Sequence, residues 1–148
     1  MGLRRKSREL FIQCYYALSY TDTDTHLLHL DYLSKYKEIL DNLADEGDIE
    51  HESVIYSFAE QLLKNIIPKI DDIDELIKEN LGEYKIEKVG ILEVIILRMA
   101  IFEMVYDKTP AAVVINEAVE LTKKYCAEKS PALVNAILDK IREKGEPV

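Results

Sequence analysis

Hydrophobic residues recur every three or four positions over most of the chain, which is the period of one face of an α-helix. The first such stripe falls within Arg4–Tyr20 and consists of Phe11, Cys14, Tyr15 and Leu18. A later stripe consists of Ile55, Phe58, Ala59, Leu62 and Ile66. No stretch alternates strictly between apolar and polar residues, and no Asn-Gly or Asp-Gly hairpin turn occurs. The pattern predicts an all-α chain of about seven helices.

The densest apolar segment, Lys88–Tyr106, is apolar on nearly every face of the predicted helix. A helix of this kind lies at the centre of a fold. The residues expected to be buried there, between two halves of the chain, are Leu92, Ile96 and Met99. Glu93 and Arg98 interrupt the segment, and three interpretations stay open for them: a surface stripe, a buried pair or an interaction site.

Polar and helix-breaking residues predict the boundaries in the first half of the chain. Asp24 or Thr25 can cap a helix that runs to about Leu40. The stretch Asp41–Glu52 contains six acidic residues, and we expect a solvated loop there. Pro68 should end or kink the helix that follows, because proline lacks a donor and clashes with the preceding turn.

Capping residues predict where the later helices begin. Asp71 and Asp72 can cap a helix that Gly82 ends. Two hydroxyl–proline pairs, Thr109-Pro110 and Ser130-Pro131, each place a capping hydroxyl before a proline. Because proline suits the first helical position, the last two helices are expected to start at these pairs.

Charge is distributed unevenly along the chain. The net charge is -9, yet four of the first eight residues are basic, namely Arg4, Arg5, Lys6 and Arg8. A basic tip on an acidic body is typical of a protein that touches a polyanion at one place, although basic N-termini in general are often only solubilising tails. Two cysteines, Cys14 and Cys126, favour a reduced, cytoplasmic protein over a disulfide framework. No stretch approaches the length of a membrane span.

Motifs for catalysis are missing from the sequence. It has no Gly-rich phosphate loop and no nucleophile elbow, so we expect neither an enzyme nor a cofactor. His26 and His29 have helical i, i+3 spacing and can share a metal ion. Two ligands without a nearby cysteine or positioned carboxylate favour solvated surface histidines instead, so no metal site is predicted.

Three segments, which cover most of the chain, resemble the NusB family of transcription antitermination proteins. The first comprises Arg4–Glu9, Gln13 and Tyr16. The second comprises Ile86–Gly90, Glu93 and Leu97–Glu103. The third comprises Pro110, Val114–Lys123, Ser130 and Val134–Ile141. The region of about Asp31 to Ile49 lies outside the resemblance, and Pro131 and Leu133 depart from the family pattern.

The resemblance implies two packed helical subdomains, about 1–82 and 83–148. It implies binding to single-stranded boxA RNA of ribosomal RNA leaders together with the ribosomal protein NusE, after which the pair modifies RNA polymerase. The residues expected to bind RNA are Arg4, Arg5, Lys6, Arg8, Gln13, Tyr16, Lys129 and Ser130. Those expected to bind NusE are Tyr16, Glu87 and Glu93.

Other functions stay open at this point. The same fold occurs as the N-terminal domain of ribosomal RNA cytosine methyltransferases, but such an enzyme needs a long C-terminal domain and this chain ends at Val148. A protein–protein adaptor that lacks RNA binding is compatible with the departures at Pro131 and Leu133. A generic helical oligomer, or a homodimer that buries the RNA surface, is a further alternative.

Overall fold

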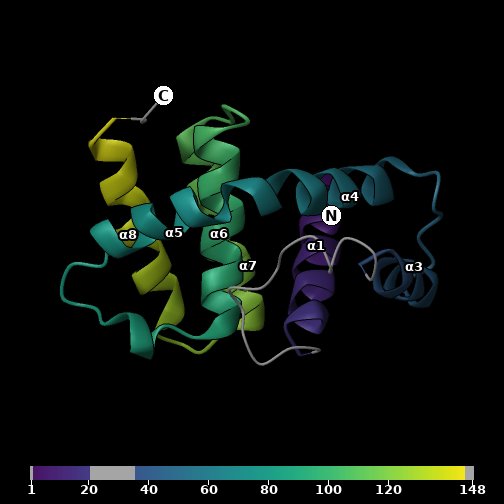
Figure 1. Cartoon of the computed structure of the whole chain (residues 1–148), viewed down its shortest axis with the longest axis horizontal. Coiled ribbons are helices and arrows are strands. Elements are labelled where there is room, and N and C mark those ends of the chain that lie inside the picture. The colour runs from purple at the N-terminus through teal and green to yellow at the C-terminus, as the bar shows by residue number, and fades with distance from the viewer. Residues whose placement is uncertain (1, 21–35, 146–148) are drawn as a thin grey trace. The chain divides into compact units, whose positions relative to one another are not determined.

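The computed structural model describes residues 2–20 and 36–145, and Figure 1 shows its helices. Every regular element in these ranges is helical, which confirms the all-α prediction. The chain forms two compact units, Met1–Ile67 and Pro68–Val148. The boundary between them lies at Pro68, whereas the subdomain division expected from the resemblance lies after Gly82.

The first unit contains α1 (Leu3–Tyr20), α3 (Tyr36–Glu46) and α4 (Val54–Ile66), and α1 packs against both of the other helices (Figure 1). The predicted stripe of α1 is fully buried in this unit. In the α4 stripe Ile55 and Phe58 are only half-buried, and the other three residues are buried. Its buried hydrophobic residues include Leu10, Phe11, Cys14, Tyr15, Leu18, Leu40, Ala44, Ala59, Leu62, Leu63 and Ile66. The helical periodicity of the sequence therefore identifies the packed faces of α1 and α4.

Helix α3 extends further than the sequence indicated. The loop predicted from Asp41 is wrong, because the helix continues to Glu46 and only residues 47–53 connect it to α4. Leu40 and Ala44, one helical turn apart, are both fully buried, so the acidic residues of this stretch occupy the outer face of a helix that the apolar contacts stabilise. The start expected at Asp24 or Thr25 lies outside the described residues.

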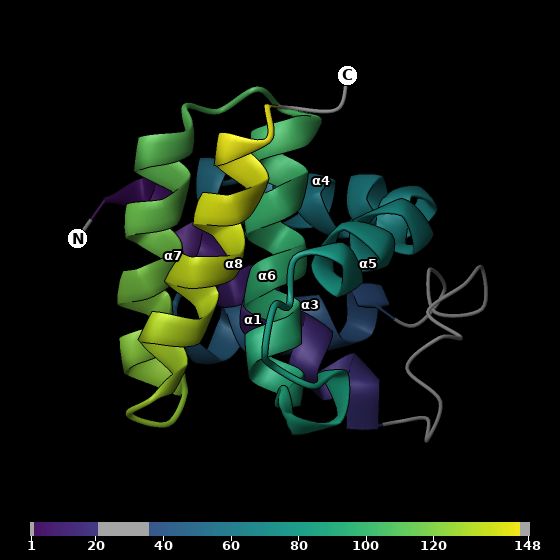
Figure 2. The same ribbon diagram turned by 90° about the vertical axis from the view of Figure 1, so that its left-hand side faces the viewer.

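The second unit contains α5 (Ile70–Glu79), α6 (Ile91–Val105), α7 (Ala111–Tyr125) and α8 (Ser130–Glu143). Short 3-10 turns stand at η2 (Ile67–Lys69) and η3 (Ile86–Lys88). Helix α6 packs against α5, α7 and α8, and Figure 2 shows α6, α7 and α8 side by side. All residues of α6 from Ile95 to Val105 are buried, which confirms the prediction of a helix enclosed on nearly every face.

The three residues expected to be buried in the central helix differ from one another. Ile96 and Met99 are 0% and 1% exposed. Leu92 is only half-buried, because it lies in the first turn of α6, before the fully enclosed part of the helix begins. Arg98 is buried within this apolar helix, where its Nε and Nη2 atoms donate to the two carboxylate oxygens of Asp74 at 2.9 Å each. This pair joins α5 to α6.

Several helix ends differ from the predicted caps. The chain after α4 turns through η2 at Pro68, as predicted. Lys69 is the N-cap of α5, so Asp71 and Asp72 are not caps but lie in the first turn, where carboxylates interact favourably with the helix dipole. Helix α5 ends at Glu79, and Gly82 adopts a left-handed φ of 62° in the turn that follows.

The two hydroxyl–proline pairs mark the starts of α7 and α8, but neither hydroxyl caps its helix. Pro110 is itself the N-cap of α7, which begins at Ala111. In α8 the N-cap is Lys129, and Ser130 is already the first helical residue. The fixed φ of proline favours the beginning of a helix at both places.

Candidate nucleic-acid interface

One face of α1 brings together four of the residues predicted to bind RNA: Arg5, Lys6, Gln13 and Tyr16. A helix turns about 100° per residue, so Gln13 falls within roughly 20° of Lys6, and Tyr16 within roughly 20° of Arg5. Lys6 and Gln13 are exposed, while Arg5 and Tyr16 are partly exposed. Cationic groups at one end of a face, with an amide and an aromatic ring further along it, can bind phosphates and unstacked bases.

The remaining two basic residues of the tip lie on a different side of α1. The guanidinium carbon of Arg4 lies 3.6 Å from the centroid of the Phe58 ring, which is close enough for a cation–π contact. Arg8 is only 4% exposed, because it precedes the buried Tyr15 by about two helical turns and shares its inward face. The four cations therefore do not form one exposed cluster.

Two predicted residues of the second unit contact each other directly. The hydroxyl of Ser130, predicted to cap α8, instead donates to Oε1 of Glu93 at 2.9 Å. Ser130 is 3% exposed, and Glu93 is half-buried in the first turn of α6. A half-buried carboxylate needs hydrogen-bond donors, and this need accounts for the position of the hydroxyl. Ser130 was predicted to bind RNA and Glu93 to bind NusE, so residues predicted for two different partners are hydrogen-bonded to each other.

The other predicted binding residues of the second unit are exposed. Lys129 is exposed beside Ser130, and Glu87 is exposed in η3. Burial, together with the nearby Glu93 carboxylate, raises the pKa of the Cys126 thiol to about 11. A thiol with a raised pKa stays protonated near neutral pH. Lys129 and Glu87 are thus the two predicted residues of this unit that are open to a ligand.

A groove beside α1 was missed by sequence reasoning. It lies between α1 and the link Gly47–Ser53, has a volume of about 520 Å³, and is bordered by Lys6 and Gln13. The acidic residues of the link were evident in the sequence. Their position opposite α1 was not, because it depends on where α3 ends and on packing between segments distant in sequence.

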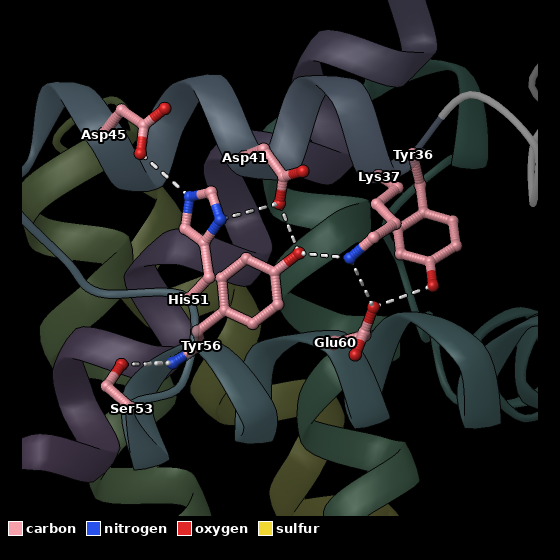
Figure 3. Close-up of polar contacts among 8 residues, drawn as sticks. All are labelled: Tyr36, Lys37, Asp41, Asp45, His51, Ser53, Tyr56 and Glu60. Carbon is pink, nitrogen blue, oxygen red and sulfur yellow. Dashed lines mark hydrogen bonds and ion pairs between the residues drawn. The ribbon is translucent and has the colours of Figure 1, made fainter.

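Next to this groove a polar network joins α3, the link and α4 (Figure 3). The Tyr56 hydroxyl donates to Asp41 and accepts from the Lys37 ammonium group at 3.1 Å. His51 Nε2 and Asp45 Oδ1 are 2.8 Å apart. Burial, assisted by the hydrogen bond to Asp41, raises the pKa of the Tyr56 hydroxyl above its usual range. The network therefore fixes the link to both helices.

Within residues 2–20 and 36–145, no three His, Cys, Asp or Glu side chains are grouped so that they could hold a metal ion. His26 and His29 lie outside the described residues. None of the described helices combines the length and the apolar composition that crossing a membrane requires.

The chain is similar to proteins of the NusB family. The model of the NusB family matches residues 5–143. The transcription antitermination protein NusB of Thermodesulfovibrio yellowstonii is 36% identical over 139 residues, which cover 93% of this chain and 90% of that protein. NusB of Geotalea uraniireducens is 35% identical over 144 residues, covering 95% and 94% of the two chains.

Two solved structures have a fold similar to that of this chain. NusB of T. maritima superimposes with a TM-score of 0.76 at 25% identity, over 97% of this chain and 93% of that one. A chain in a crystal structure of the antitermination factors NusB and NusE with double-stranded RNA gives a TM-score of 0.76 at 23% identity, over 97% and 98%. The second likeness concerns the fold alone.

Proposed function

The chain belongs to the NusB family, and from this premise we propose that it acts in transcription antitermination by binding single-stranded, boxA-like RNA together with the ribosomal protein NusE. Relatives over nearly the whole length carry the name transcription antitermination protein. A protein of the same fold occurs in a complex of NusB, NusE and RNA. In this proposal the protein is a binding factor in the cytoplasm, and it reaches RNA polymerase through the complex it forms.

The observation that carries the RNA part is the face of α1 with Arg5, Lys6, Gln13 and Tyr16. Phosphates of a single strand bind the two cations, and bases stack on the ring and bond to the amide. Lys129, exposed in the second unit, stays a predicted RNA contact of that unit. Arg8 contributes less than the sequence suggested, because its side chain is buried.

The NusE part rests on Glu87 and Glu93. A ribosomal protein is typically basic, and carboxylates opposite a basic surface accelerate association and stabilise the complex. Glu87 is exposed, whereas Glu93 already accepts a hydrogen bond from Ser130. We therefore assign the electrostatic attraction mainly to Glu87, and give Glu93 a double role of holding Ser130 and facing the partner.

A binding measurement with purified NusE tests this assignment. Glu87→Lys is expected to slow association with NusE, more at 50 mM than at 300 mM salt, because screening weakens exposed charge pairs. Glu83→Lys, an exposed acid a few residues earlier, is the matched control. Equal kinetics for the two variants would remove Glu87 from the interface.

A second candidate function is an adaptor that binds NusE but not RNA. The burial of Arg8 and the engagement of the Ser130 hydroxyl by Glu93 favour it, since both withdraw groups predicted for RNA. Titration of the protein–NusE complex with a single-stranded boxA-like RNA separates the two functions: the antitermination factor binds the RNA and the adaptor does not. A homodimer that buries the α1 face would appear in the same experiment as RNA binding that weakens with rising protein concentration.

A further inference from the structure

The groove beside α1 has an apolar floor. Leu10 of α1, Leu43 of α3, Ile49 of the link and Ile55 of α4 all line it. Its volume of about 520 Å³ falls in the range of sites that enclose several side chains or a small ligand. A floor of four aliphatic residues between three helices favours an occupant with apolar surface.

The rim of the groove is acidic. Glu9, Asp48 and Glu50 contribute three carboxylates, against a single ammonium group from Lys6. An RNA backbone would place phosphates against this excess of negative charge, whereas a cationic group is attracted to it. Lysine and arginine combine a long apolar stem with a charged head, so the stem can lie on the floor while the head reaches the carboxylates.

The wall opposite α1 is held in place before any ligand arrives. The Ile49 N–H donates to the Ala44 carbonyl at 2.8 Å, and the Ser53 N–H donates to the Glu50 carbonyl at 3.0 Å. The His51 ring stacks on Tyr56 with centroids 5.1 Å apart (Figure 3). A link fixed in this way loses little conformational freedom on binding, which favours affinity.

We propose that this groove binds an extended segment of a basic protein, which inserts a lysine or arginine side chain flanked by aliphatic residues. The charge of the rim selects the cation, and the floor selects its apolar neighbours. The groove shares Lys6 and Gln13 with the α1 face proposed to bind RNA. It differs in recognising a peptide, and the proposal does not depend on RNA binding.

The probe is a capped peptide of alternating leucine and lysine, seven residues long, titrated into the isotopically labelled full chain and followed by NMR. We expect amide shifts in residues 47–53, which form the wall across from α1. The Asp48→Asn/Glu50→Gln variant should raise the dissociation constant by about 2- to 30-fold, which is the effect of losing two exposed ion pairs. Asparagine suits position 48 because it tolerates the left-handed φ of 55° found there.

The matched control is Glu46→Gln/Glu52→Gln, which removes two exposed acids of the same region that do not line the groove. Control binding should equal that of the unchanged chain, and a peptide with glutamate in place of lysine should not bind. The proposal is overturned if both double variants bind alike, or if the peptide shifts no amide in residues 47–53. It is also overturned if a single-stranded RNA 12-mer, and not the peptide, shifts those amides, since the groove would then be an RNA subsite.

Discussion

Replacing Asp74 by Asn tests whether its ion pair with Arg98 holds α5 against α6. The Arg98 side chain is 4% exposed and that of Asp74 is 17% exposed, so the guanidinium would lose the Asp74 carboxylate in a nearly dry environment. Breaking a buried pair by removing one partner costs about 3–5 kcal/mol. Because Asp74 keeps some contact with water and Asn retains one acceptor oxygen, we expect the lower end, about 3 kcal/mol.

Urea unfolding followed by circular dichroism at 222 nm measures this cost. With a urea dependence of about 1–3 kcal/mol per molar, the midpoint should fall by roughly 1–3 M. Glu75→Gln, an exposed change on the same helix, is the control and should alter the free energy of unfolding by less than about 0.5 kcal/mol. The Asp74→Leu/Arg98→Met double variant should recover much of the loss, because neither half of the pair is then buried without the other. If Asp74→Asn unfolds at the midpoint of the control, the pair does not hold α5 in place.

Three further predictions concern stability. Ile96→Ala should cost about 2–5 kcal/mol in chemical denaturation, since Ile96 is completely buried and its loss leaves a cavity; an unchanged midpoint would show that α6 is peripheral. Ser53→Ala should cost about 1 kcal/mol by removing the oxygen that accepts from the Tyr56 N–H, and Ser57→Ala, an exposed change within α4, should cost less. Burial raises the pKa of the Cys14 thiol from 9.0 to about 12, so the folded state keeps a proton that the unfolded state releases. The contribution of Cys14 to the free energy of unfolding should therefore be fully present below pH 9. It should fall between pH 9 and 12 by up to about 1.4 kcal/mol per pH unit, and the Cys14→Ala variant should show a shallower fall.

Helix positions were predictable because burial imposes a period on the sequence. The stripe that contains Phe11 and Leu18 has a single periodic interpretation, and the structure confirms it. The end of α3 was not predictable in the same way. Six acids in twelve residues suggested a loop, yet two apolar residues, Leu40 and Ala44, packed against another helix are enough to keep the stretch helical as far as Glu46.

The candidate site shows the same limit at the level of single side chains. Arg98 had three open interpretations, and only the position of Asp74 on a different helix identifies it as half of a buried pair. Arg8 was grouped with its basic neighbours because sequence proximity does not report which way a helix faces. The Ser130 hydroxyl was expected to cap α8, but a half-buried carboxylate from α6 competes for it. Each difference comes from a contact between elements, which local patterns do not encode.

The central claim is that one face of α1 binds single-stranded RNA, and the salt dependence of binding tests it most directly. Each phosphate neutralised on a single strand contributes about 0.7 to the slope of log affinity against log salt. Arg5→Ala/Lys6→Ala should therefore flatten the slope by roughly 1.4 with a boxA-like RNA, whereas Tyr16→Ala should weaken binding by about 1–3 kcal/mol with the slope unchanged. Lys64→Ala/Lys78→Ala removes two exposed cations from other helices as a control. Curves for the Arg5/Lys6 variant that superimpose on those of the control would contradict the claim.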